Sequence, residues 1–310
     1  MRIVHLTPGA GDNFYCENCL RDAGLLRAMK RLGHEVFMVP LYLPPRAEAN
    51  GDVSRTPLFF GGVNVFLQQK CGLFRHTPRW VDKLLDSPRL LALASRKAGM
   101  TRARDLGETT LSMLQGEHGR QVKELARLVD FLAADAHPDA IILSNALLLG
   151  LAPRIRERLD VPVVCVLQDE DGFLDALPEP YCSQCWDLLR ALAAEADGLV
   201  SPCRYCSGEM SRRLGCGVHR TIPNGIEPEM YAPAHAPPEL PTLGFLSQLA
   251  GNKGLDTLAE AFIRLRRRPG LEQVQLRLAG GQTEADAPAV QAMRNRLAKD
   301  GCDHAVEVIE

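Results

Sequence analysis

The sequence has no excess of charge of one sign. Its 310 residues carry 36 lysines and arginines against 38 aspartates and glutamates, a formal net charge of −2. Without a positive surplus there is no electrostatic reason to expect a nucleic acid or an anionic membrane as the main partner. We expect an ordinary soluble globular protein, whose length favours two domains.

Long apolar runs and secretion signals are also lacking. The apolar run from Ala140 to Ala152 is shorter than a bilayer span and includes Ser144 and Asn145. The opening MRIVHL is too short for the apolar region of a signal peptide, because it runs directly into a Pro-Gly turn. From these two absences we expect a cytoplasmic protein without a transmembrane segment.

Apolar patterns alternate between strand and helix along the chain. RIVHL is typical of a buried strand, and the next helix has apolar residues at Leu25, Ala28, Met29 and Leu32. The strands HPDAIILS, VPVVCVLQ and DGLVSP are each followed by a helical pattern, such as ALLLGLAPRIRERL. This alternation predicts a parallel sheet covered on both faces. The stretch 44–119 is less regular, with a predicted strand pair (PLFFGGVNVFLQQ) and arginine-bearing helical segments, and we interpret it as an insertion.

A proline-rich connector divides the chain. EPEMYAPAHAPPELP spans residues 227–241, and after it TLGFLS, a helix and VQLRLAG restart the alternation. We predict an N-terminal Rossmann-like domain over residues 1–226, a linker over 227–241 and a partial Rossmann-like domain over 242–310. The expected fold class is α/β, with two doubly wound parallel sheets of which the second is incomplete.

The turn after the first strand, TPGAGDN, joins that strand to a helix N-terminus. This geometry directs backbone N–H groups and the positive end of a helix dipole toward an anion. We expect Gly9 and Gly11 to face a sugar or another substrate group. A tight strand–helix connection without a ligand is the alternative.

Further motifs, around the connector and in the N-terminal half, resemble a known family. TIPNGIEPEMY, followed by LGFLSQLAGNKGLDTLAEAF and LRLAGG, closely resembles the retaining family 4 glycosyltransferases with the GT-B fold. In the N-terminal half, VPVVCVLQDED and ADGLVSPCRYCSGEM match other patterns of that family. The resemblance covers nearly the whole chain apart from residues 44–119. It implies two Rossmann-like domains that face a cleft, with a nucleotide-sugar held mainly by the second.

The resemblance also implies a reaction. A hexose would move from a nucleoside diphosphate sugar to a glycan, lipid or small-molecule acceptor, with retained anomeric configuration and no required metal cofactor. The family holds the donor diphosphate with an Arg and a Lys, whose positions match Gln248 and Lys253 here. Lys253 supplies a positive charge where negative charge grows on the leaving diphosphate. Gln248 brings no charge, a loss of roughly 1.5–3 kcal/mol, or about ten- to a hundredfold in rate.

Four more residues are expected near the sugar or the acceptor. Gln168 stands where the family has a histidine facing the donor sugar, so it can bind hydroxyls without acid–base chemistry. Asp169 follows it, while Asn224 and Gly225 are expected to line the domain junction or to form only a turn. Residues 169–171 also contain the D-x-D that holds a divalent ion in the GT-A fold. Because no second GT-A signal supports that interpretation, we assign these acids an acceptor-side or structural role.

The C-terminal part departs further from the family. Its E-x7-E element is missing, and residue 310 falls on the predicted third strand of the second domain. TLGFLS is therefore expected at an open sheet edge, and the donor site is expected to be incomplete. The alternatives are a catalytically inactive or fragmentary sugar-nucleotide-binding relative, and a zinc-stabilised interaction module on the same fold.

Ten cysteines are more than a cytosolic domain usually carries. C-x-x-C pairs occur at residues 16 and 19, at Cys182 and Cys185, and at Cys203 and Cys206. The last two pairs have the spacing of a four-thiolate structural zinc site. Both pairs also begin predicted helices, which favours buried or helix-capping thiols. These four cysteines are the candidate zinc ligands, and the first pair is interpreted as structural.

Overall fold

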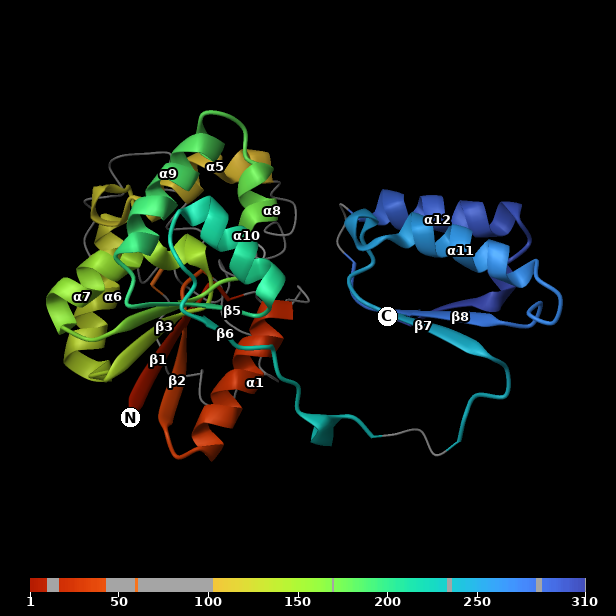
Figure 1. Ribbon diagram of the computed structural model, residues 1–310, viewed down its shortest axis with the longest axis horizontal. Coiled ribbons are helices and arrows are strands. Elements are labelled where there is room, and N and C mark those ends of the chain that lie inside the picture. The colour runs from red at the N-terminus through yellow and green to blue at the C-terminus, as the bar shows by residue number, and fades with distance from the viewer. Residues whose placement is uncertain are drawn as a thin grey trace, which may run out of the picture. The chain divides into compact units, whose positions relative to one another are not determined.

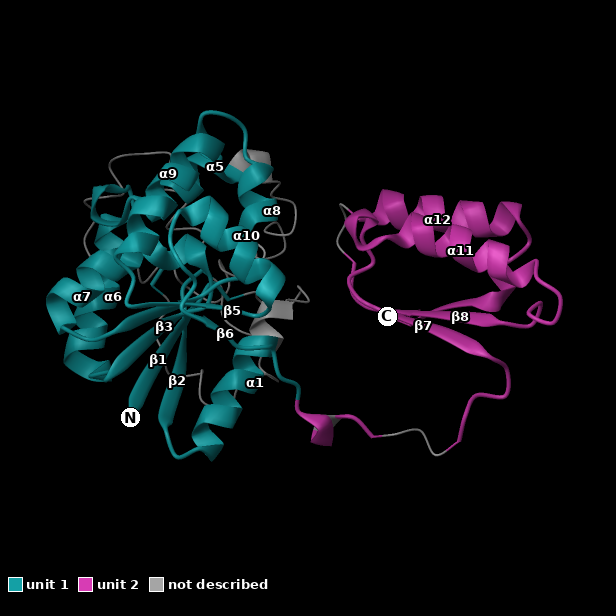
Figure 2. Ribbon diagram, viewed as in Figure 1, with its two compact units in different colours: residues 1–226 teal, residues 227–310 magenta. Residues whose placement is uncertain are grey.

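The computed structural model describes residues 1–9, 17–42, 59–60, 103–168, 170–232, 236–282 and 286–309. The chain divides into two compact units, unit 1 (Met1–Ile226) and unit 2 (Glu227–Glu310), shown in Figure 2. Each unit has a parallel sheet of its own with helices packed on it.

The sheet of unit 1 has six parallel strands in the order β2-β1-β3-β4-β5-β6. β1 pairs along its whole length with β2, from Arg2 opposite Glu35 to Thr7 opposite Pro40. On its other side β1 pairs with β3, beginning with Ile3 opposite Ala140. The strands are β1 (Arg2–Thr7), β2 (Glu35–Pro40), β3 (Ala140–Leu143), β4 (Val163–Val166), β5 (Gly198–Ser201) and β6 (Arg220–Thr221).

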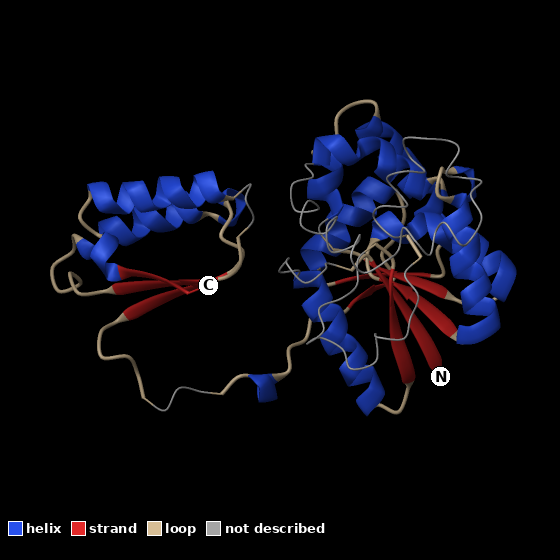
Figure 3. Cartoon of the chain, turned by 180° about the vertical axis from the view of Figure 1, so that it is seen from behind, coloured by secondary structure: helices blue, strands red, loops and turns tan. Residues whose placement is uncertain are grey.

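Helices cover both faces of this sheet (Figures 1 and 3). α1 (Glu17–Arg31) packs on one face, in a small core with Ile3, Leu26 and Ile142. The larger core lies on the other face, beneath the later helices. These are α5 (Ala103–Leu114), α6 (Val122–Phe131), α7 (Ala152–Leu159), α8 (Glu170–Asp175), α9 (Tyr181–Ala194) and α10 (Arg204–Leu214), with the shorter helices η4 (Gly116–His118), η5 (Leu132–Ala136) and η6 (Ala146–Leu151).

The sheet of unit 2 has three parallel strands in the order β7-β8-β9, so β7 lies at an edge. Its helices α11 and α12 lie on one face (Figure 3), where Leu276 and Leu278 of β8 pack with Phe262 and Met293. Leu246 at the end of β7 is 79% exposed. The elements are η7 (Pro228–Met230), β7 (Thr242–Leu246), η8 (Gly251–Lys253), α11 (Leu255–Arg266), β8 (Gln275–Ala279), α12 (Ala287–Lys299), η9 (Asp303–Ala305) and β9 (Val306–Ile309).

The structure confirms the predicted fold class and the edge position of TLGFLS, which forms β7. Two details were wrong. The single helix predicted over residues 146–159 is η6 followed by α7. The buried face of α1 includes Asp22, Ala23 and Leu26; of the predicted stripe, Met29 packs against this core, whereas Leu32, one residue beyond the helix, is 77% exposed. The predicted strand pair around residues 58–69 lies outside the described residues, except for positions 59 and 60. Among the described helices, none is long and apolar enough to cross a bilayer.

Candidate functional site

The carboxyl edge of the unit 1 sheet contains a reversal of strand order. The chain goes from β1 to β2 on one side and then crosses to β3 on the other, and the helices that follow β1 and β3 cover opposite faces. In open parallel sheets a crevice forms outside the strand ends at such a reversal, and ligands bind there. Thr7, which ends β1, and Ser144, which follows β3, mark this edge.

A fully buried carboxylate, Asp22 of α1, lies at this reversal. Its Oδ2 lies 3.1 Å from Nε2 of His5 and accepts a hydrogen bond of 3.2 Å from the Thr7 hydroxyl. Its Oδ1 accepts from Nε of Arg21 at 2.9 Å and also from Nη2 of the same guanidinium. A buried charge is tolerated where it is paired and hydrogen-bonded. Both oxygens of Asp22 meet that condition.

The surroundings of Asp22 keep it ionised. Burial by itself raises the pKa of this carboxyl, but His5 and Arg21 together outweigh burial and lower the pKa below its ordinary value. Nδ1 of His5 and the Ser144 hydroxyl are buried without a hydrogen-bond partner within the part of the chain that the structure describes. Buried polar atoms normally pair with protein groups or ordered water. Within the described residues, the carboxyl edge of the unit 1 sheet therefore has polar atoms without a hydrogen-bond partner beside the ion pair of Asp22 and Arg21.

The carbonyl oxygen of Ser144 connects β3 to its neighbours. It accepts hydrogen bonds from Nη2 of Arg21 at 3.1 Å and from Nε2 of Gln168, which follows β4. The Gln168 backbone N–H donates to Oε2 of Glu170 at 2.7 Å, and Oε1 of Glu170 accepts from the Ala146 N–H at 2.7 Å. One polar network thus crosses the carboxyl ends of β1, β3 and β4. We call it the switch-point network, and it comprises His5, Thr7, Arg21, Asp22, Ser144, Gln168 and Glu170.

The structure brings one of the predicted unit 1 residues, Gln168, into this network. Gly9 follows β1 at φ 75°, a conformation that favours glycine. Gly11 and Asp169 lie outside the described residues. Asn224 and Gly225 follow β6 and are exposed.

The prediction missed most of the switch-point network. His5 and Asp22 each stand in a mainly apolar pattern, RIVHL and the α1 repeat, and a polar residue at such a position is a usable signal of a buried pair. Arg21 precedes Asp22 and carried no separate signal. Glu170 lies in the acidic triplet, and the structure shows it buried with both oxygens accepting backbone N–H groups.

The four candidate zinc ligands lie on two helices. Cys182 and Cys185 are inside α9, whereas Cys203 is the N-cap of α10 and Cys206 lies in its first turn. All four are free thiols. Over the described ranges, no group of three or more His, Cys, Asp or Glu side chains is arranged to hold a metal ion. The structure therefore does not bring these four sulfurs together as a metal site.

In unit 2 the carboxyl edge is formed by the segments after β7 and β8. Nε2 of Gln248 donates to Oδ2 of Asp286 at 2.9 Å, which joins the two segments. Lys253 ends η8 and is exposed. Gly254 follows at φ 83° as the N-cap of α11, where no side chain caps the helix within the described residues. A helix N-terminus of this kind favours negative charge.

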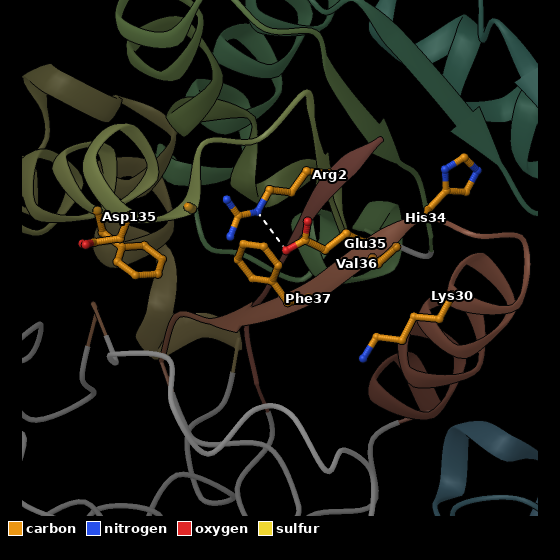
Figure 4. Close-up of a pocket in the computed structure, with 9 residues that line it drawn as sticks. Arg2, Lys30, His34, Glu35, Val36, Phe37 and Asp135 are labelled. Atoms are coloured by element: carbon orange, nitrogen blue, oxygen red, sulfur yellow. Dashed lines mark ion pairs between the residues drawn. The ribbon is translucent and has the colours of Figure 1, made fainter.

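A hollow in the described part of unit 1 lies at the opposite edge of the sheet (Figure 4). It has a volume of about 490 Å³ and is lined by residues at the starts of β1 and β2, including the ion pair of Arg2 Nε and Glu35 Oε1 at 3.1 Å. Lys30 and His34 line it from the end of α1 and the turn that follows. Because ligands of parallel sheets bind outside the carboxyl ends of the strands, the switch-point network remains the candidate site.

Solved structures identify the class of fold. The chain is similar to HepE from Anabaena in complex with UDP, at 13% identity and a TM-score of 0.58, over 100% of this chain and 69% of that one. It is also similar to sucrose-phosphate synthase from Thermosynechococcus elongatus, at 14% identity and a TM-score of 0.62, over 100% and 70% of the two chains. At this level of identity the likeness concerns the fold, which is that of the GT-B glycosyltransferases.

The family follows from the sequence match. A family model described as a glycosyl transferase 4-like domain matches residues 23–225, more than half of the chain. The chain therefore belongs to the glycosyl transferase 4-like family. A search of curated proteins gives no match.

Proposed function

We propose that this protein transfers a hexose from a nucleoside diphosphate sugar to an acceptor, with retention of the anomeric configuration. The observation that carries the proposal is the switch-point network, a fixed polar arrangement at the ligand-binding edge of a chain from a glycosyltransferase family. Such an edge suits hydroxyl-rich ligands, because sugar hydroxyls both donate and accept hydrogen bonds.

The donor diphosphate belongs to the edge of unit 2 in this proposal. Lys253 supplies an exposed ammonium, and the N-terminus of α11 directly after it supplies backbone N–H groups and a positive dipole end. Both features stabilise the negative charge that grows on the diphosphate as the glycosidic bond breaks. Gln248 is a weaker partner, because its amide already donates to Asp286 and carries no charge.

The sugar and acceptor belong to the edge of unit 1. Gln168 is held by the Ser144 carbonyl and by Glu170, so its position is fixed before a ligand arrives. Preorganised polar groups reduce the reorganisation that a reaction requires. Gly9 lies at the same edge, and Gly11, Asp169, Asn224 and Gly225 are proposed to complete the sugar- and acceptor-facing surface.

A donor panel tests the proposal. HepE was solved in complexes with UDP and with UDP-glucose, so uridine diphosphate sugars are the first to try, followed by guanosine and adenosine diphosphate sugars. Release of nucleoside diphosphate and the anomeric form of the product by NMR are the measurements, with and without a chelator. We expect turnover of one donor class that persists with the chelator, and a product anomer that matches the donor.

The donor panel also distinguishes a retaining glycosyltransferase from a catalytically inactive sugar-nucleotide-binding protein. An inverted product would contradict retention, and loss of turnover with the chelator would contradict a metal-independent reaction. Tight nucleotide binding measured by calorimetry, without any turnover, would instead favour a sugar-nucleotide-binding protein. The observation that favours this second candidate is the uncharged Gln248, engaged by Asp286, at a position where the resemblance implies an arginine.

A further inference from the structure

Cys203 and Cys206 are placed around the start of α10. Cys203 is the N-cap, with an extended backbone (φ −157°, ψ 164°), and its Sγ accepts the backbone N–H of Cys206 at 3.3 Å. The extended N-cap folds the Cys203 side chain back over the first turn. Its sulfur therefore lies beside the backbone of the second cysteine.

The other described C-x-x-C pair supplies an internal comparison. Cys182 and Cys185 both lie within α9, where side chains three residues apart have Cβ atoms about 5–6 Å apart. A disulfide requires Cβ atoms about 3.5–4.5 Å apart. Cys185 is also fully buried, and burial raises the pKa of its thiol to about 11. Cys182 and Cys185 therefore have the same sequence spacing as Cys203 and Cys206, but their positions within a helix do not suit a disulfide bond.

Access and contacts distinguish the two sulfurs of the α10 pair. Cys203 is exposed, whereas Cys206 is partly buried and its Sγ donates to the carbonyl oxygen of Gln168 at 3.3 Å. An exposed sulfur can be attacked or can attack, and a second sulfur one helical turn away can resolve the product. The second thiol of the pair also contacts a member of the switch-point network.

We propose that Cys203 and Cys206 form a reversible dithiol–disulfide site that exchanges with a low-molecular-weight disulfide such as oxidised glutathione. The Cys203 thiolate attacks one glutathione sulfur, a mixed disulfide forms, and the first glutathione leaves as a thiolate. The Cys206 thiolate then attacks the Cys203 sulfur and releases the second glutathione. The two protein thiols are oxidised, glutathione disulfide is reduced to two thiols, and both protein protons end on glutathione.

Oxidation changes the contact between α10 and the switch-point network. A disulfide sulfur carries no hydrogen, so the Cys206 bond to the Gln168 carbonyl is lost. The redox state of Cys203 and Cys206 is thereby linked to the segment after β4, which contains Gln168. This inference does not depend on the proposed transfer reaction.

The test is a redox titration of the full chain. The protein is equilibrated in glutathione buffers of increasing oxidised fraction, quenched in acid, unfolded in denaturant, alkylated and digested, and each cysteine peptide is quantified by mass spectrometry. We expect Cys203 and Cys206 to lose alkylation together as one intramolecular disulfide, which dithiothreitol reverses. Cys182 and Cys185 remain alkylated throughout and serve as the matched control.

Two serine variants test the order of attack. In Cys206→Ser the glutathione adduct on Cys203 accumulates, because no second thiol resolves it. In Cys203→Ser adduct formation on Cys206 is slower by about tenfold or more, because that sulfur is less accessible. Circular dichroism shows whether each variant is folded. Free thiols at both positions across the whole titration of the wild-type protein, or a mixed disulfide that never converts to the intramolecular bond, would overturn the proposal.

Discussion

The charged side chains at the carboxyl edges of the two sheets differ in burial. In unit 1 the carboxylate of Asp22 is fully buried and is paired with Arg21, whose side chain is only 11% exposed. In unit 2 the ammonium of Lys253 is exposed, next to a helix start that no described side chain caps. The same kind of sheet edge therefore carries buried charges in one unit and an exposed charge in the other.

The difference in burial suggests different roles: a buried charge pair positions structural elements, whereas an exposed charge can contact a ligand. A buried ion pair has lost its hydration and depends on its partners, so it fixes the elements that carry those partners. Asp22 joins α1 to β1 through His5 and Thr7, and Arg21 joins α1 to β3. An exposed cation remains in contact with solvent, where an anionic ligand can reach it. We infer that unit 1 contributes a rigid surface and unit 2 contributes charge.

The largest expected effect concerns the buried carboxylate. Asp22→Asn keeps the size of the side chain but leaves the Arg21 guanidinium without its counter-charge in a nearly dry environment. Removing one partner of a buried pair costs about 3–5 kcal/mol, so the free energy of unfolding should fall by that amount. Urea unfolding followed by circular dichroism measures it.

An exposed pair in the same unit is the control for this experiment. Asp187 and Arg190 are three residues apart on α9, with side chains 73% and 49% exposed. Asp187→Asn should change the free energy of unfolding by less than about 1 kcal/mol. Equal losses in the two variants would mean that Asp22 does not fix unit 1 as described.

Substitution of Lys253, the exposed cation of unit 2, should lower the activity without changing the stability of the fold. Lys253→Ala removes a charge that is proposed to face the leaving diphosphate, and loss of one such group lowers kcat by about 10²–10³-fold. Lys299, exposed at the end of α12, is the matched control, and Lys299→Ala should leave kcat unchanged. Steady-state release of nucleoside diphosphate gives both values. An active Lys253→Ala variant would remove the donor role of this edge.

The sequence was informative about elements whose signal is local. RIVHL and TLGFLS form β1 and β7 because a short apolar run is enough to specify a parallel strand, buried in β1 and largely exposed at the edge position of β7. The helix over residues 146–159 was predicted only in part, because its first six residues form a 3-10 helix. A Cβ atom on Gly150 would lie 2.2 Å from the carbonyl oxygen of Met113. That close backbone approach involves a segment far away in the sequence and leaves no periodic signal.

The candidate site was harder to predict for a similar reason. The stripe predicted for α1, through Leu25 and Leu32, only partly overlaps the observed buried face, which includes Asp22 and Leu26 and has Met29 packed against it. A count of apolar residues passes over Asp22 and does not show that this carboxylate pairs with His5. Gln168 was found because a resemblance assigned it. The contacts that fix it are tertiary and come from three different strand ends.

Adding a positive charge at position 248 tests the proposal that Gln248 is a weak partner for the donor diphosphate. Gln248→Arg restores a cation at a position where the resemblance implies one, and a hydrogen bond to a charged group contributes roughly 1.5–3 kcal/mol. We expect turnover to rise by about ten- to a hundredfold. Gln248→Met, which removes the donor to Asp286 without adding charge, is the control and should not raise turnover. If the arginine variant shows no gain, position 248 does not face the diphosphate.

The smallest effect is a pH dependence specific to unit 1. The folded-state pKa of Asp22 lies below its unfolded value, so ionisation of this group stabilises the fold fully above the unfolded pKa of about 3.9. That contribution is lost as the pH falls through the folded-state pKa, where Asp22 takes up a proton. The stability difference between the wild-type protein and Asp22→Asn should therefore be constant near neutral pH and should narrow below about pH 4. Urea unfolding of both proteins between neutral and acidic pH measures the difference. A gap that stays constant or widens on acidification would show that the ionised carboxylate is not what holds α1 against the sheet.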